Sequence, residues 1–303
     1  MHLLPLLAPL VLASAVLGAD HTNHDEHDHS AHAEWYNNGT NDITIHESCN
    51  ATQATQIGKA LDDMKALASH ARDRVLRYGS NDTLYQLYFG NGDPASVIGT
   101  FSRLVEGDKT DVLFRCDNPD NNCHQEGWAG HWRGSNATSE TVICELSYTS
   151  RRPLEQFCGF GYSVANSSAN FYFGSDLLHR LFHIPKIFEG WVSHFADPWE
   201  DCVDLAKVNG TYAVRNQHSL QFFAVDAWGR DIVDEENWEG CPGYELSRII
   251  DVEASGESKS TTTEPVSSAA SSATASVTAI LAATTTAAAA ACHTHADGSV
   301  HCD

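Results

Sequence analysis

The chain has 303 residues, in which 40 acidic side chains outnumber 18 basic ones and give a formal net charge of −22. A surface this acidic repels the phosphate backbone, so nucleic acid is excluded as a partner. The same excess of carboxylates attracts cations. The 17 histidines, nearly as many as all lysines and arginines together, make a metal ion the first ligand to consider.

Residues 1–18 have the pattern of a secretory signal peptide, because a short apolar run ends in small residues that suit cleavage near Gly18 or Ala19. We therefore expect a secreted, extracellular protein, released or held at the cell wall, in which disulfides are the default state of the nine cysteines. No later apolar run is long enough for a membrane span. The expected N-glycosylation sites are Asn38, Asn50, Asn81, Asn136, Asn166 and Asn209.

Composition divides the rest of the chain into distinct stretches. Residues 19–39 form a segment rich in histidines and acids that is expected to be disordered, because residues 19–34 contain no large apolar group for a core. Residues 40–253 contain the periodic patterns of a folded domain. Residues 254–291 are mostly Ser, Thr and Ala, a composition typical of an extended, O-glycosylated stalk. Residues 292–303 form a tail rich in Cys and His.

The first element expected in the domain is a long amphipathic helix. Apolar residues recur at steps of three and four from residue 57 to residue 78, which places them on one helical face. Thr52 and Thr55 are the alternative caps at its start, and Gly79 is expected to end it.

Two strands and two further helices follow in chain order. Residues 110–117 and 140–148 have the composition of strands and flank a loop rich in Asn, Asp and Gly. A second helix is expected to start at Ser175 and to stop at Pro185, and a third covers residues 219–227. These elements predict the α+β class, helix-rich, with a small sheet.

The second predicted helix carries His179 and His183. A spacing of four residues places both imidazoles on one face of a helix, where they can bind one metal ion. Two ordinary hydrogen-bonded histidines would show the same spacing, so the pair alone is weak evidence. A third ligand must come from downstream, where His194, Asp197 and His218 are the candidates.

Both ends of the chain offer further ligands. Thiolates with imidazoles in the C-terminal tail suit Zn²⁺, and the alternative there is a Cys292–Cys302 disulfide with incidental histidines. The alternative for the N-terminal cluster is a solvated acidic segment. The ligand candidates are Cys292, His293, His295, His301 and Cys302 in the tail, and His21, His24, His27, His29 and His32 near the N-terminus.

The HRxxH form of residues 179–183, the Ser/Thr/Ala stalk and the ending CHTHADGSVHC together resemble the fungal zincophore family of pH-regulated antigens, which includes a major mould allergen. That family is in turn similar to the deuterolysin-type zinc proteases, the aspzincins. The resemblance implies a zincin-like (deuterolysin-like) domain that binds Zn²⁺. It also implies a secreted protein that scavenges extracellular zinc and returns it to a plasma-membrane zinc transporter.

The same resemblance carries over to particular residues. The segment NQHSL at residues 216–220 is similar to the protease segment Asn-Ala-Asp-Ser-Tyr, whose Asp is the third zinc ligand. His218 is therefore expected to complete the site with the two helix histidines, while the second protease Asp falls near His194 or Asp197. The disulfides that the family implies are Cys49–Cys116, Cys123–Cys144 and Cys158–Cys241. In that pairing Cys202 is alone, or it takes Cys158 in place of Cys241.

Arg180 distinguishes this chain from the zinc proteases with HExxH, in which the Glu takes the proton from zinc-bound water. Arginine stays protonated and only donates hydrogen bonds, so it cannot be that base. We therefore expect a binding protein and no enzyme. The alternatives are a peptidase with another base, such as Glu189, and a surface ligand for host extracellular proteins. Asp176 or Glu189 is the candidate acid that could pair with Arg180.

Overall fold

The structure is a computed structural model that describes residues 42–234, 239–245, 292–294 and 300–302. The predictions for residues 1–39, for the stalk at 254–291 and for His295 lie outside the described residues. Asn38 and the N-terminal histidines belong to the first of these segments.

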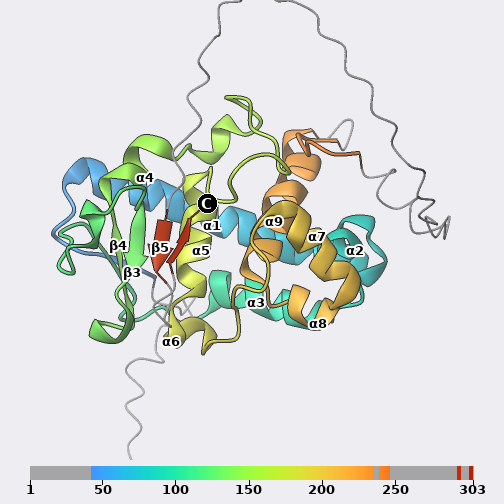
Figure 1. The fold of residues 1–303 in the computed structure, drawn as a ribbon, viewed down its shortest axis with the longest axis horizontal. Helices are drawn as coiled ribbons and strands as arrows, with labels where there is room; N and C mark the ends of the chain where they lie inside the picture. The colour runs from blue at the N-terminus through green and yellow to red at the C-terminus, as the bar shows by residue number, and fades with distance from the viewer. Residues whose placement is uncertain (1–41, 235–238, 246–291, 295–299, 303) are drawn as a thin grey trace, which may run out of the picture. The chain divides into compact units, whose positions relative to one another are not determined.

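A small sheet forms one side of the domain (Figure 1). Its strands are β1 (Thr44–Ile45), β2 (Leu113–Arg115), β3 (Gly130–Trp132) and β4 (Glu140–Ile143), in the order β1-β2-β4-β3. β1, β2 and β4 are parallel, and β3 is antiparallel to β4. The strand predicted over 140–148 is wrong beyond residue 143, because the chain turns at Cys144 into helix α4 (Glu145–Ser150). β3 was not predicted.

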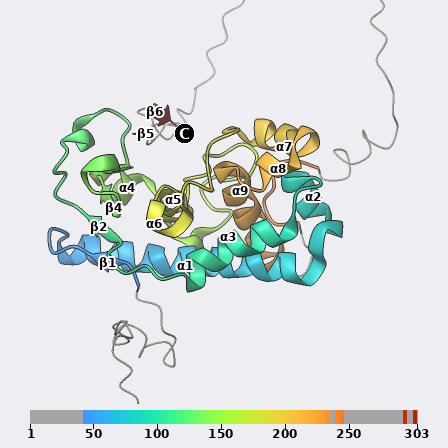
Figure 2. The same ribbon diagram turned by 90° about the horizontal axis from the view of Figure 1, so that it is seen from below.

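Helix α1 (Ala51–Tyr78) runs along the whole domain, as Figure 2 shows, and carries the predicted apolar face inward. Neither predicted threonine caps it. Asn50 does, because its side chain accepts from the backbone N–H of Gln53, and the Gln53 side chain accepts in return from the N–H of Asn50. Gly79 ends the helix with a φ of 65°, as predicted.

Helices α3 (Pro94–Glu106), α5 (Phe173–Phe182) and α9 (Gln217–Trp228) pack against α1, and the other helices lie around them (Figure 2). The other longer ones are α2 (Thr83–Phe89) and α7 (Trp199–Val208). The short ones are α6 (Pro185–Phe188) and α8 (Gly210–Ala213), with a π-helical turn at Gly229–Val233 and 3-10 turns at Gly79–Asn81, Asn122–His124, Gly134–Asn136 and Leu154–Gln156.

Two of the predicted helix starts are wrong. α5 begins at Phe173, before Ser175, because Tyr172 forms a β-bridge with Arg152 that fixes the chain one residue ahead of the helix. α9 begins at Gln217, two residues before the predicted start, so His218 lies in its first turn. α5 ends ahead of Pro185, as predicted.

Aromatic side chains and disulfides hold these elements together. Phe223 of α9 lies among the rings of Tyr85, Tyr88, Phe89 and Phe101, with the Phe89 ring centroid 5.0 Å away. The disulfides are those that the family resemblance implies, Cys49–Cys116, Cys123–Cys144 and Cys158–Cys241.

The thiol of Cys202 is buried, and burial raises its pKa to about 12, so it is protonated and unreactive at neutral pH. Among the described residues, no helix has the length and apolar character needed to cross a membrane. The fold is α+β and helix-rich with a small sheet, as predicted.

Candidate metal centre

The last turn of α5 and the residue that caps it present two imidazoles toward the same point. His179 is 2% exposed, and the Nε2 atom of His183 lies 3.3 Å from the Nε2 atom of His179. Two nitrogens that each bind one tetrahedral Zn²⁺ at about 2.0–2.1 Å lie about 3.4 Å apart. The two Nε2 atoms are therefore separated as two ligands of one zinc ion would be.

A loop that follows α6 brings a third imidazole to this pair. The backbone of Ser193 forms a β-bridge with Asn216, just before α9. The Asn216 side chain then accepts hydrogen bonds from the N–H groups of Phe195 and Ala196, at 2.8 and 3.0 Å. These bonds fasten the loop to the start of α9, and His194 is fixed beside the first turn of that helix.

Asp197 links the loop histidine to the helix histidine. Its Oδ1 atom accepts a hydrogen bond from Nδ1 of His194 at 2.8 Å and lies 3.2 Å from Nδ1 of His218. A carboxylate on one ring nitrogen is the usual partner of a metal-binding imidazole, because it orients the ring and leaves the other nitrogen for the metal. Asp197 can therefore serve either as a ligand or as the support of two ligands.

The described residues contain two overlapping groups of potential ligands. In each group the ligand atoms lie within 4.8 Å of one another: His179 with His183 and His194, and His194 with Asp197 and His218. The imidazole centroids of these histidines lie 5.1 to 5.7 Å apart in the measured pairs. The alternate ligand His194 thus joins the helix pair directly, and His218, expected as the third ligand, joins through the second group.

Gln217 is a site residue that sequence reasoning missed. It is fully buried, and its side-chain amide contacts Nδ1 of His179. The amide nitrogen is the atom that faces Nδ1 here. With the amide turned over, its oxygen would accept a hydrogen bond from the Nδ1–H of His179, which leaves Nε2 with a lone pair for a metal. The only local signal was its place next to His218, because a glutamine by itself does not indicate a metal site.

Arg180 is buried and paired with an acid, at 4% exposure. Its Nε and Nη2 atoms donate to the two oxygens of Asp176 at 2.9 and 3.0 Å, and Arg151 donates to the same carboxylate at 3.2 Å. A side chain on Gly130 of β3 would collide with the Arg180 guanidinium, at 2.6 Å from Nη1. Arg180 therefore joins α5 to β3.

Of the two acids proposed for Arg180, Asp176 is the partner. Glu189 instead accepts a hydrogen bond from Arg103 at 3.3 Å. Its side chain is 75% exposed, and it belongs to neither group of ligands in the described residues.

A pocket of about 530 Å³ opens beside the ligands. Asp197 and His218 form part of its wall, together with Trp199, Glu200 and Phe222. A solute can therefore reach the edge of the histidine cluster from this side.

The C-terminal tail forms a two-stranded antiparallel sheet of β5 (Cys292–Thr294) and β6 (Val300–Cys302). Its register places Cys292 opposite Cys302 and His293 opposite His301. The backbone thus brings four of the predicted tail ligands together in pairs, as neighbours across two strands.

The fold and the cluster define a helix-rich domain with an HRxxH helix whose two histidines meet ligands from a loop and a second helix. A model of the HRXXH family, described as "Putative peptidase family", matches residues 2–244. The chain belongs to this family.

Several characterised proteins are similar to the chain. Major allergen Asp f 2 of Aspergillus fumigatus is 46% identical over 245 residues, which cover 80% of this chain and 77% of the allergen. The pH-regulated antigen PRA1 of Candida albicans is 43% identical, over 69% of this chain and 70% of the antigen. Protein ZPS1 of Saccharomyces cerevisiae is 36% identical, over 66% of this chain and 79% of that protein.

Among solved structures, a zinc peptidase from Grifola frondosa is similar to this chain with a TM-score of 0.44 and 13% sequence identity. The match covers 59% of this chain and 97% of the peptidase.

Proposed function

We propose that the protein is a secreted zinc-binding protein that scavenges extracellular Zn²⁺ and delivers it to a zinc transporter of the plasma membrane. The observation that carries the proposal is the distance of 3.3 Å between the Nε2 atoms of His179 and His183, with His194 in the same group. Imidazole nitrogens and a carboxylate are ligands that Zn²⁺ accepts in its tetrahedral sites.

The surroundings of these ligands fit a zinc ion. His194 has its carboxylate at Asp197, and His179 has the amide of Gln217, so two rings are held by a second layer of polar groups. The net charge of −22 concentrates cations around the protein. Zinc is the cargo in this proposal, and the site residues bind and release it.

The tails are proposed to load and transfer zinc. Imidazoles have an unperturbed pKa of about 6.5, so protonation competes with zinc at each histidine ligand. Ligands in the tails should lose zinc between about pH 7.5 and about pH 5.5, while the cluster of the folded domain, which includes the buried His179 and His218, holds it to lower pH. Zinc titrations at several pH values, with and without residues 292–303, test this order of release. Equal release in both proteins would contradict it.

The central experiment measures zinc stoichiometry. Replacing His183 by Ala should remove about one equivalent of tightly bound zinc, because the remaining imidazoles leave the site incomplete. His124 is an exposed histidine outside both ligand groups, and His124→Ala is the matched control that should keep the full stoichiometry. Equal zinc content in the two variants would contradict the proposal.

Delivery needs its own test. Zinc-starved cells should take up labelled zinc from the loaded wild-type protein, and a zinc transporter deletion should abolish that uptake. Uptake that is unchanged by the deletion would leave zinc binding intact and contradict delivery.

Loss of peptidase activity is also part of the proposal. Arg180 holds the position of the catalytic Glu and is engaged with Asp176, so it takes no proton from a zinc-bound water. The zinc-loaded protein should cleave casein and unstructured peptides no faster than His179→Ala does. The family's description as peptidases and the pocket beside Asp197 and His218 favour the alternative, a peptidase with another base. Cleavage that is lost in His179→Ala would establish that alternative.

A further inference from the structure

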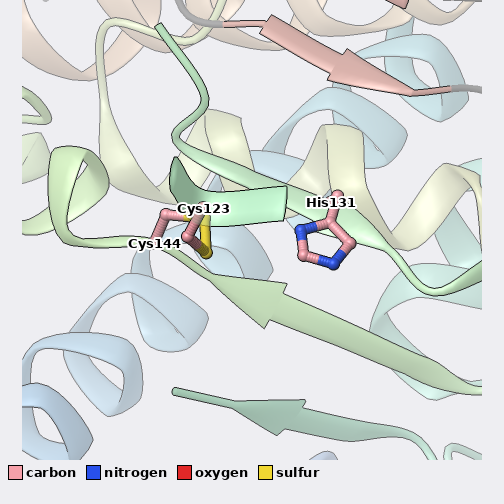
Figure 3. Close-up of side chains that lie close together, drawn as sticks. All are labelled: Cys123, His131 and Cys144. Carbon is pink, nitrogen blue, oxygen red and sulfur yellow. A yellow bond between two sulfur atoms is a disulfide. The ribbon is translucent and has the colours of Figure 1, made fainter. Parts of the chain in front are cut away.

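A second cluster of metal-ligand side chains lies in the sheet region, away from the histidines of α5 and α9. Figure 3 shows the imidazole of His131, on β3, next to Cys123 and Cys144. One ligand atom from each of these residues lies within 4.8 Å of the others. The two cysteines form a disulfide, so their sulfurs are not available to a metal while it is intact.

One ring nitrogen of His131 has a carboxylate partner, and the other has none among the described residues. It is 1% exposed, and its Nε2 atom lies 3.2 Å from Oδ2 of Asp120. Two hydrogen bonds from Arg133 hold that carboxylate, at 2.7 and 3.1 Å. This arrangement places the ring proton on Nε2, because the carboxylate only accepts, and leaves the lone pair on Nδ1.

The Nδ1 atom of His131 is buried and makes no hydrogen bond to any described residue. Burying a nitrogen lone pair without a hydrogen-bond donor costs folding free energy, so the arrangement needs an explanation. In Figure 3 one ring nitrogen faces the cysteine pair, and since Nε2 is engaged with Asp120, that nitrogen is Nδ1. The lone pair is therefore directed toward two sulfur atoms, which cannot donate to it as a disulfide.

We propose that Cys123, Cys144 and His131 form a redox-gated zinc site, which is closed while the disulfide is intact and opens when it is reduced. The expected ligands are two thiolates and Nδ1 of His131, with a water in the fourth position. Cys123 is partly exposed, which gives water and zinc a route to the site.

The two cysteines can pass from the disulfide to the zinc-bound form without movement of the backbone. Two thiolates that bind one tetrahedral Zn²⁺ at about 2.3 Å lie about 3.8 Å apart. The Cα atoms of Cys123 and Cys144 are 5.4 Å apart, so rotation of the two side chains can provide that separation. Cys144 is also anchored, because its N–H donates to the carbonyl of Ala129, the residue just before β3, at 2.9 Å.

Reduction and reoxidation of the Cys123–Cys144 disulfide open and close the site. A dithiol reductant gives two electrons and two protons to the disulfide and becomes a disulfide itself, which leaves two cysteine thiols. Zinc then replaces the two thiol protons, which go to solvent. In reverse, a disulfide oxidant takes two electrons from the two thiolates and two protons from solvent and becomes a dithiol, while the Cys123–Cys144 bond forms again and Zn²⁺ leaves. The site shares no residue with the histidine cluster, so either can exist without the other.

The test uses the full chain with Cys292→Ser and Cys302→Ser, which removes the tail thiols, and with Co²⁺ as the probe. A phosphine is the reductant, because it has no thiol of its own; it becomes the phosphine oxide with oxygen from water, and the cysteines take the two protons. Reduction should create a thiolate-to-cobalt absorption band and about one further equivalent of bound metal. Absence of both would overturn the proposal.

Matched variants locate the band. His131→Gln should weaken the new binding at least about tenfold, and Asp120→Asn should weaken it by about 10- to 100-fold, as loss of a carboxylate partner does. Cys49→Ser with Cys116→Ser removes a disulfide that belongs to no group of potential metal ligands among the described residues. This double variant should leave the band in place. A band that persists at full strength in Cys123→Ser with Cys144→Ser would assign the thiolates to another pair and overturn the proposal.

Folding is followed in the same samples by helical circular dichroism and by the metal bound before reduction. Zinc should preserve or restore the helical signal of the reduced protein, because it replaces the covalent link between Cys123 and Cys144. A reduced protein that unfolds and is not restored by zinc contradicts the proposed site.

Discussion

The histidine cluster and the Cys123–His131–Cys144 cluster have much in common. Each contains an imidazole with a carboxylate on one ring nitrogen, at 2.8 Å for His194 and 3.2 Å for His131. In each, the ligand atoms lie within 4.8 Å of one another. The clusters differ in the chemical state of the donors, because two donors of the second are joined as a disulfide. Both clusters therefore hold their ligand atoms close together, but the sulfur atoms of the second can bind a metal only after the disulfide is reduced.

The largest effect is expected at the residue that both groups of the histidine cluster share. Loss of a supporting residue weakens metal binding by up to about 100-fold. His194→Ala should lower zinc affinity by more than that, because it removes a ligand from each group. His218→Ala affects one group and should cost less. Competition with a zinc chelator gives both affinities, and a greater loss in His218→Ala would make His218 the third ligand of the helix pair.

Arg180 lies between the two clusters, since its helix carries His179 and its guanidinium contacts Gly130, the neighbour of His131. Arg180→Met should destabilise the protein by about 3 kcal/mol, because it leaves the buried Asp176 carboxylate with Arg151 alone. Arg180→Lys keeps the charge and should lose less. Urea unfolding measures both, and equal stability of Arg180→Met and wild type would show that the pair has no net effect.

The supporting residues allow the two clusters to be compared directly. Asp197→Asn and Gln217→Leu should each weaken zinc binding by about 10- to 100-fold in the oxidised protein. Asp120→Asn should leave that binding unchanged, since it supports only His131. The same chelator competition checks all three, and a loss in Asp120→Asn would mean that the clusters are coupled.

The smallest effect concerns acid stability away from both clusters. Burial alone would raise the pKa of Asp231, but hydrogen bonds from His70 and Arg74 of α1 lower it overall. Because the folded pKa is lowered, the carboxylate contributes stability above its unfolded pKa of about 3.9, and this is lost as the pH falls through the folded value. Asp231→Asn should cost about 1–2 kcal/mol at pH 7 and show a smaller loss below pH 4. A constant difference between pH 7 and pH 2.5 would contradict this assignment.

Local patterns predicted part of the fold well. The helix that ends at Gly79 and the one that stops ahead of Pro185 depend on residues within a few positions of each other, and both ends were predicted correctly. Helix starts were predicted less well. Asn50 caps α1 through a reciprocal pair with Gln53, which competes with nearby threonines for the same role. Short elements such as β3 carry too few residues for a periodic signal.

The sequence by itself determined the helix-rich class, the HRxxH pair and the candidates for the downstream ligands, because an i, i+4 spacing on a helix fixes which side chains share a face. Only the tertiary structure decided how those candidates combine. The bridge between Ser193 and Asn216 places His194 beside α9. The antiparallel pairing of β3 with β4 places His131 near Cys144, which follows β4. Such contacts join residues distant in the chain, and packing of the whole domain selects them; no local spacing encodes them.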